Sequence, residues 1–223
     1  MNLLKSSITK KIIMALTGAG LILFIIAHLL GNLQIFIGQD KFNEYAAFLK
    51  SLGGLLWVAR LGLIAIVVSH IIAAISLTKL NSNAKPIDYK VKNKHKASTA
   101  SMYMAHSGMI IFFFIVIHLL HFTFGYLQPQ YYNLPPDSLG RHDVYTMVIY
   151  GFQTPVYAIG YVIAIIGLGF HLSHATSSMF QTVGISGPKI TPLIKKAAVG
   201  LAVAIVIGYI SIPLAVLGGF IGA

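Results

Sequence analysis

Cysteine is missing from all 223 residues of the chain. Its absence excludes a disulfide framework, iron–sulfur clusters held by cysteine, and the C-x-x-C-H attachment of c-type haem. Charged residues are also scarce, at 9% of the chain, and only five residues are acidic. Hydrophobic residues make up 57%, more than a soluble domain of this size needs. The composition therefore predicts an integral membrane protein.

Five apolar segments are each long enough to cross a bilayer, which takes about 20 residues of helix. The predicted spans cover residues 11–34, 56–79, 102–127, 148–178 and 195–219. The part of the fourth span before Pro155 is expected to lie at the membrane interface. The short basic N-terminus continues into the first span without a cleavage pattern, which indicates a retained helix rather than a signal peptide. We therefore predict an all-α fold, with residues 1–223 forming one bundle of five transmembrane helices.

The charge of the connecting segments alternates along the chain. Three of them are rich in lysine: the N-terminus (Lys5, Lys10, Lys11), the second connection (Lys79 to Lys96) and the fourth (Lys189, Lys195, Lys196). The first and third connections balance bases with acids, and the third, Gln128 to Asp143, is expected to be an ordered external segment. Lysine-rich loops stay on the cytoplasmic side, so the N-terminus is predicted to be cytoplasmic and the C-terminus external. This distribution also explains the net charge of +11 without nucleic-acid binding.

Four of the five spans each contain a histidine well inside the apolar segment, namely His28, His70, His118 and His171. An imidazole in such a place needs a partner other than water. A helix rises 1.5 Å per residue, which places His28 and His118 in the outer leaflet and His70 and His171 in the inner leaflet. Two bis-imidazole sites stacked across a membrane fit two b-type haems that carry electrons between the leaflets.

Other interpretations of these histidines remain open. A single intramembrane histidine is more often a polar contact between helices, and proton relays or transition-metal transport are further alternatives. His121 and His174 follow His118 and His171 by three residues and share their helix faces, so spacing alone does not choose the ligands. A short repeat, hydroxyl-Gly-x9-His-Leu-Leu, begins at Thr17 and again at Ser107, and it favours His118. His95 and His106, at the cytoplasmic end of the third span, and His142, in the external connection, are expected to be ordinary interfacial residues.

With these residues in view, the chain resembles the cytochrome b membrane anchor of bacterial succinate dehydrogenase and quinol:fumarate reductase, of the single-polypeptide, five-helix, di-haem type. The resemblance rests on the segments AHLLGNLQIFIG, FNEYAAFLKSLGG, VVSHIIAAISL, SGMIIFFFIVIHLLHF and GFHLSHATSSMFQTVGIS. It implies that His28 and His118 bind the haem distal from the catalytic subunits, and that His70 and His171 bind the proximal one. It also favours His171 over His174.

The resemblance implies partners and a location. The partners are a flavoprotein with covalent FAD and an iron–sulfur subunit, docked at the cytoplasmic face of the bacterial inner membrane, with (mena)quinone as the substrate. The chain would then be part of an enzyme without acting on succinate itself, and the whole complex could form a higher oligomer. The lysine-rich connections are well placed for docking, although a topology signal with anionic-lipid contact explains them equally well.

The sequence leaves the quinone site and the direction of the reaction open. Asn32, Gln34 and Glu44 lie near the level of the outer pair, and His121 and His174 are further candidates for quinone or haem-propionate contacts. Every acidic residue falls in a connection and position 169 is glycine, so we expect no carboxylate path for protons through the bundle. The competing functions are fumarate reduction, the di-haem anchor of another dehydrogenase or a hydrogenase, and a histidine-dependent transporter. A transporter is disfavoured because it would be expected to contain intramembrane carboxylates.

Overall fold

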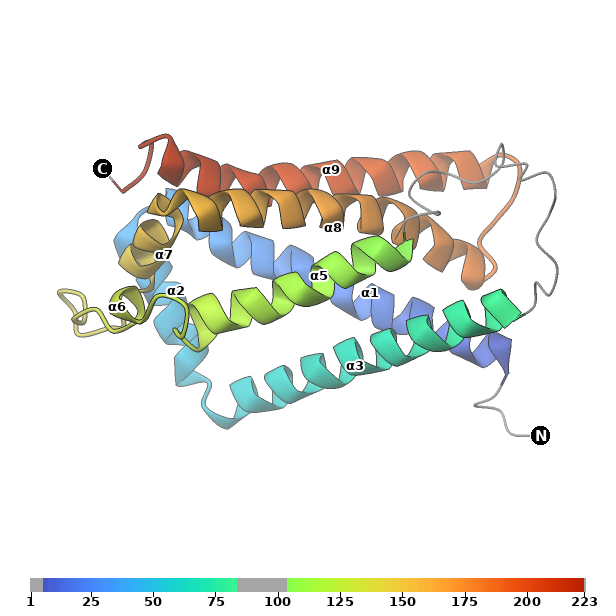
Figure 1. Cartoon of the computed structure of the whole chain (residues 1–223), viewed down its shortest axis with the longest axis horizontal. Helices are drawn as coiled ribbons and strands as arrows, with labels where there is room; N and C mark the ends of the chain where they lie inside the picture. The colour runs from blue at the N-terminus through green and yellow to red at the C-terminus, as the bar shows by residue number, and fades with distance from the viewer. Residues whose placement is uncertain (1–5, 84–103, 223) are drawn as a thin grey trace.

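The structure is a computed structural model that describes residues 6–83 and 104–222. Within these ranges all of the regular secondary structure is helical and there is no strand. Five stretches of helix are long and apolar enough to cross a membrane: Ser7–Phe36, Gly54–Asn81, Met104–Thr123, Pro155–Thr182 and Ile190–Leu217. They run side by side along the long axis of the molecule (Figure 1). The predicted fold class, an all-α multi-pass membrane protein with five spans, is therefore confirmed.

The long helices are joined by several short ones. In chain order the elements are α1 (Ser7–Asn32), η2 (Leu33–Phe36), α2 (Gln39–Ser51), α3 (Gly54–Asn83), α5 (Met104–His118), η4 (Leu119–Thr123), α6 (Pro129–Tyr132), α7 (Val144–Gln153), α8 (Pro155–Thr182) and α9 (Ile190–Leu217). Helix α8 packs along α9, α1 packs against α3 and α8, and α5 packs against α8. The two chain ends lie at opposite ends of the bundle (Figure 1), as an odd number of spans requires.

Helices α2, α6 and α7 gather at the end of the bundle where the C-terminus lies (Figure 1). This is the end that the lysine distribution assigns to the external side, and we call it the external end. The fourth predicted span began at residue 148, but the transmembrane helix starts at Pro155. Proline lacks a backbone N–H and disfavours helical geometry in the residue before it. Thr154 is accordingly extended, and the stretch before Pro155 forms the separate helix α7.

The third transmembrane helix ends at Thr123, four residues before its predicted end. Its last turn, η4, is a π-helix, which contains one more residue per hydrogen-bonded turn than an α-helix. Gly125 then adopts a positive φ of 70°, and the Tyr132 ring occupies the space that a side chain would take there. Because both features stop helix propagation, the chain leaves the bundle at this point.

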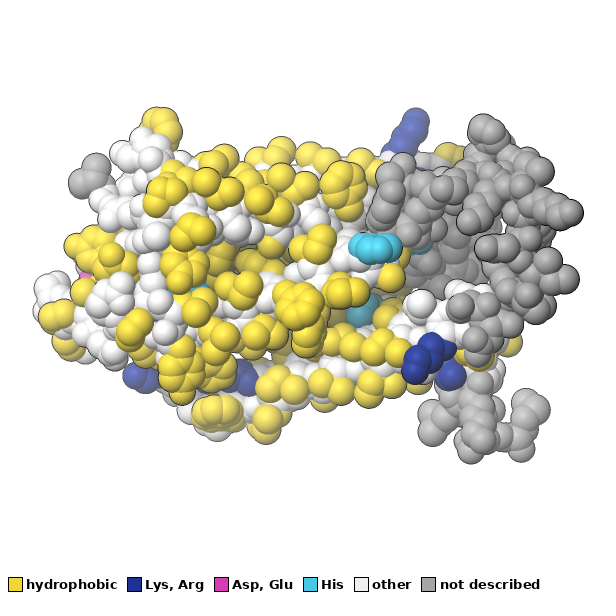
Figure 2. All heavy atoms as spheres, in the orientation of Figure 1, with side chains coloured by type: hydrophobic (Ala, Val, Ile, Leu, Met, Phe, Trp, Pro, Cys, Tyr) yellow, Lys and Arg dark blue, Asp and Glu magenta, His cyan; other side chains and the backbone are white. Residues whose placement is uncertain are grey.

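Hydrophobic side chains cover the length of the bundle, while lysine and arginine gather toward its two ends (Figure 2). Apolar surface of this extent is suited to lipid rather than water. Tight packing is found instead near the external end, where Ile35, Phe42, Ile149, Phe152 and Tyr161 form a buried cluster. This cluster brings together η2, α2, α7 and α8. It forms a rigid wall beside the outer pair of histidines.

Candidate functional site

The structure brings the outer pair of histidines together. His28 lies one turn before the end of α1 and His118 is the last residue of α5. Their ring centres are 5.9 Å apart and the rings are nearly perpendicular, at 79°. Phe24 stacks on His28 at 5.3 Å. The two imidazoles thus face each other between helices, as the depth argument predicted.

A chain of hydrogen bonds connects His118 to buried polar groups near the external end. The Nδ1 atom of His118 lies 3.4 Å from the Tyr161 hydroxyl oxygen, which also lies 3.1 Å from Nδ1 of His121. On the other side of that ring, Nε2 is 2.6 Å from Oε1 of Gln128, and the Gln128 amide donates to Thr154 at 3.0 Å. Tyr161, His121 and Gln128 are 5%, 2% and 6% exposed. These polar groups therefore satisfy one another without water.

This chain of hydrogen bonds distinguishes His121 from His118 as candidate ligands, which the sequence spacing could not do. Both ring nitrogens of His121 are hydrogen-bonded to protein groups, and its ring stacks on Phe122 at 3.9 Å. His121 also lies within the π-helical turn η4, where the usual relation between i and i+3 no longer holds. Within the described residues, His118 is hydrogen-bonded at Nδ1, to Tyr161, and not at Nε2. The geometry therefore favours His118 over His121 as a ligand.

The inner pair is held by the hydroxyl-glycine part of the sequence repeat. His70 and His171 each lie the same number of residues after the start of their helices, α3 and α8. The Thr17 hydroxyl oxygen is 3.0 Å from Nδ1 of His70, and the Ser107 hydroxyl oxygen is 3.2 Å from Nδ1 of His171. The two imidazoles thus have matching hydroxyl partners on neighbouring helices.

The glycines of the repeat lie against the same two rings. A β-carbon added to Gly18 would stand 3.6 Å from Cε1 of His70, and one added to Gly108 would stand 3.6 Å from Cε1 of His171. This is ordinary van der Waals contact, so any larger side chain would press on the imidazole. Each glycine therefore lets an imidazole of another helix approach the backbone closely.

The remaining candidate residues do not converge on either pair. The Asn32 amide donates to the His28 carbonyl oxygen at 2.7 Å. Glu44 is an exposed residue of α2 paired with Lys41 at 2.7 Å, and Gln34 lies in η2. His174 is one turn beyond His171 on α8, and its carbonyl accepts from the Ser177 hydroxyl. The structure thus shows where these residues lie, while their roles toward a quinone or a propionate stay predictions.

The acidic residues of the described chain lie at the external end, in α2 and between α6 and α7. There Arg141 pairs with Asp40 and Asp137, both at 2.8 Å. Burial alone would raise the pKa of Asp137, but hydrogen bonds from the Arg141 backbone and side chain, from Asn43 and from the Leu139 backbone lower it to about 2. The expected external segment is therefore ordered by ionic and hydrogen-bonded contacts. Asp88 and the lysines between residues 85 and 96 lie outside the described residues, as does His95.

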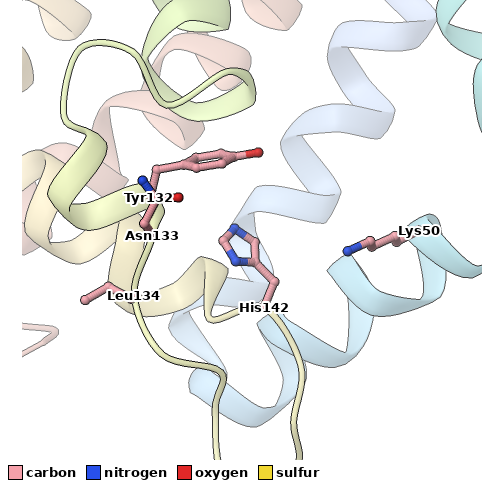
Figure 3. Close-up of a pocket in the computed structure, with 5 residues that line it drawn as sticks. All are labelled: Lys50, Tyr132, Asn133, Leu134 and His142. Carbon is pink, nitrogen blue, oxygen red and sulfur yellow. The ribbon is translucent and has the colours of Figure 1, made fainter.

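A polar pocket opens beside this ionic cluster. It has a volume of about 390 Å³ and is lined by Lys50, Tyr132, Asn133, Leu134 and His142 (Figure 3). Partial burial and the charge of Lys50 lower the pKa of His142, although Asp143 opposes them. The lowered pKa favours the neutral form of this imidazole. The interfacial role expected of His142 stays a prediction.

Sequence reasoning did not assign roles to Tyr161, Gln128 or the two hydroxyls of the repeat. Their partners lie 40, 7, 53 and 64 residues away, and three of the four contacts cross between helices. The repeat did mark Thr17 and Ser107, but only as landmarks for the histidines that follow them. The sequence signal that could have pointed to Tyr161 is a tyrosine hydroxyl inside an apolar span that also contains a histidine.

No family model, curated protein or solved structure matches this chain. Function must therefore be argued from the site itself. Among residues 6–83 and 104–222, no three histidine or acidic side chains come together as a metal-binding cluster. Of the four histidines predicted as ligands, His28 and His118 are in ring contact, whereas His70 and His171 each lie against a hydroxyl of a neighbouring helix.

Proposed function

We propose that this protein is the membrane-anchor cytochrome b subunit of a bacterial succinate:quinone oxidoreductase. It would bind two haem b groups and connect an iron–sulfur subunit at the cytoplasmic face with quinone, for which menaquinone is the expectation, in the inner membrane. The observation that carries the proposal is the sorting of four intramembrane histidines into two pairs at two depths. FAD and iron–sulfur clusters would belong to the partner subunits.

The residues present fit haem at both levels. Two imidazoles bound to opposite sides of one metal ion, through metal–nitrogen bonds of about 2 Å, have ring centres about 6 Å apart. The separation of 5.9 Å between His28 and His118 agrees with this value. At the inner level, Gly18 and Gly108 leave room beside the imidazoles of His70 and His171. Pairs of histidines are also the usual axial ligands of b-type haems, whereas structural metal-ion sites mostly use four ligands.

Haem supplies one-electron redox chemistry when bound, and the protein determines its position and surroundings. His28 and His118 would hold the outer haem, and His70 and His171 the inner one. Their rings come from helices packed in a fixed register, with hydroxyls at Nδ1 that orient three of them. Apolar side chains around them exclude water, which favours transfer of electrons over side reactions. Electrons would thus cross the membrane by way of two haem sites, one in each leaflet.

The direction of the reaction and the partner dehydrogenase are separate matters from the haem sites. The same chain could work with a fumarate-reducing complex, or anchor a different dehydrogenase. The absence of acidic residues from all five spans speaks against a proton-coupled transporter and against a carboxylate proton path. The quinone is proposed to bind near the outer pair, on the side remote from the soluble subunits.

Haem content tests the proposal directly. The purified protein should show a b-type spectrum on reduction and contain two haems per chain. Replacing His28 or His118 with leucine should leave one haem, and so should replacing His70 or His171. His142→Leu is the matched control, because that imidazole lies in the external pocket with Lys50 and Tyr132, outside both histidine pairs, and this variant should retain both haems. A wild-type protein without haem, or with a single haem, would contradict the proposal.

The partners need a separate experiment. Co-expression with flavoprotein and iron–sulfur subunits of a bacterial succinate dehydrogenase should give a complex that contains covalent flavin. Succinate should then reduce the inner haem, and His28→Leu should abolish quinone reduction while electron transfer from succinate to a soluble dye continues. A two-haem protein that accepts electrons only from another dehydrogenase would support the competing anchor function.

A further inference from the structure

Hydroxyl groups lie at Nδ1 of three of the four intramembrane histidines. We propose that these hydroxyls are positioning residues for the ligands: Thr17 for His70, Ser107 for His171 and Tyr161 for His118. Each hydroxyl oxygen accepts the Nδ1 proton of its imidazole, so Nε2 is left with a free lone pair to bind iron. The inference rests on the proposed haem function and assigns to these side chains the choice of tautomer.

The backbone contacts of Thr17 and Ser107 decide the direction of their hydrogen bonds. A hydroxyl has one proton to donate and two lone pairs to accept with. Thr17 donates its proton to the Ile13 carbonyl oxygen at 2.7 Å, and Ser107 donates to the Met104 carbonyl oxygen at 3.0 Å. With the proton used in this way, each oxygen can only accept from the imidazole. His70 and His171 must therefore carry their proton on Nδ1.

The outer level reaches the same result through a longer chain. The Gln128 amide nitrogen donates to Thr154, so its oxygen accepts the proton on Nε2 of His121. Nδ1 of His121 is then unprotonated and accepts the Tyr161 hydroxyl proton at 3.1 Å. The Tyr161 oxygen is left to accept from Nδ1 of His118 at 3.4 Å. The reverse order of donors would put a proton on Nε2 of His118 and block metal binding.

A hydrogen bond from the distant nitrogen has a second effect on a ligating imidazole. It makes the ring a stronger electron donor to the metal, which favours the oxidised haem. Losing the acceptor should therefore raise the reduction potential of that haem. The free energy of one such bond, about 0.5–1.5 kcal/mol, corresponds to about a two- to tenfold fall in the ratio of oxidised to reduced haem at a fixed electrode potential.

Optical redox titration of the purified two-haem protein tests the inner level. Thr17→Val and Ser107→Ala should each lower the oxidised-to-reduced ratio of the inner haem by about two- to tenfold, and leave the outer haem unchanged. Two matched controls make the same backbone bonds without touching an imidazole: Thr182 donates to the Ser178 carbonyl at 2.9 Å, and Ser177 donates to the His174 carbonyl at 3.0 Å. Thr182→Val and Ser177→Ala should change neither haem.

Tyr161→Phe tests the outer level, where it should shift only the outer haem. The control is Tyr132→Phe, because the Tyr132 hydroxyl donates to the Thr123 carbonyl oxygen and not to an imidazole. Rescue variants guard against a purely structural effect: Thr17→Ser keeps the hydroxyl and should restore the wild-type ratio, whereas Thr17→Ala should not. If Thr17→Val does not retain the inner haem, haem retention is compared between Thr17→Ser and Thr17→Ala instead. Retention in Thr17→Ser but not in Thr17→Ala would support a role of the hydroxyl, and equal retention would contradict it.

The outcomes separate the two proposals. A wild-type protein without haem would overturn the proposed function and this inference together. A two-haem protein in which Thr17→Val and Thr182→Val have equal effects, or in which each hydroxyl variant shifts both haems alike, would overturn the inference alone. Shifts confined to the predicted haem, with rescue by Thr17→Ser, would support it.

Discussion

Replacing Asn43 with alanine should strongly destabilise the external end of the bundle. The Asn43 side chain is fully buried, at 0% exposure, and joins α2 to the segment before α7. Its amide donates to Asp137 at 3.1 Å and to Asp143 at 3.0 Å, and its oxygen accepts from the Tyr145 backbone at 2.9 Å. Alanine removes all three bonds and leaves two carboxylates short of a donor.

The expected loss follows from the type of each bond. A neutral hydrogen bond contributes about 1 kcal/mol and one to a charged group about 1.5 kcal/mol or more, so Asn43→Ala should cost about 4 kcal/mol or more. For a chain of this size, each kcal/mol corresponds to a shift in melting temperature of about 2–4 °C. Thermal unfolding in mild detergent, followed by circular dichroism, measures that shift.

A matched control is available at the surface of the same region. Asn133 is exposed, and its amide donates to the Pro129 carbonyl oxygen at 2.9 Å. Asn133→Ala should therefore change stability by less than about 0.5 kcal/mol. If Asn43→Ala and Asn133→Ala melt at the same temperature, the assigned role of the buried amide is refuted.

Two further predictions concern charge and topology. The pKa of Asp137 is about 2 in the folded protein against an ordinary value of 3.8, so its stabilising contribution is complete above pH 4 and disappears as the pH falls toward 2. The melting temperature of Asp137→Asn should therefore vary less over this interval than that of the wild-type protein. Equal melting profiles for the two proteins would contradict the assignment. Because the chain has no cysteine, single-cysteine variants report topology without background. A membrane-impermeant thiol reagent should label Lys50→Cys on intact cells but Lys11→Cys only after permeabilisation, and the opposite pattern would reverse the predicted orientation.

Sequence alone predicted the fold because the features of a membrane helix are local. About 20 apolar residues in succession define a span whatever they pack against, and lysine counts in the loops give an orientation. The two levels of histidine followed from the helical rise and from the alternating direction of the spans. That reasoning placed His28 beside His118, which the structure confirms as a contact.

The short helices and the polar networks could not be predicted in the same way. Asn43 bonds Asp143 across 100 residues of chain, and nothing near either residue in the sequence identifies the other. The role of His121 depends on the π-helical turn η4, which changes the face that a residue three positions after His118 presents. Contacts of this kind arise from packing between elements, whereas hydrophobic periodicity reports only on a single element.

The sequence repeat gains a physical explanation only in three dimensions. In each copy, the hydroxyl and the glycine contact a histidine of a different helix, α3 for Thr17 and Gly18, and α8 for Ser107 and Gly108. The histidine within each copy lies further along the helix and belongs to the outer pair. One unit repeated on α1 and α5 therefore has residues at both levels, a histidine of the outer pair and, against a histidine of the inner pair, a hydroxyl and a glycine.

This arrangement constrains the spacing within each copy of the repeat. The hydroxyl and the histidine are separated by eleven positions in both copies, about three turns of helix, so they project from the same face. That rise of about 16 Å sets the distance between the inner and outer levels. Inserting or deleting a residue between them would rotate one level by about 100° relative to the other. The spacing therefore fixes how the hydroxyl at the inner level and the histidine at the outer level are oriented relative to each other on each helix.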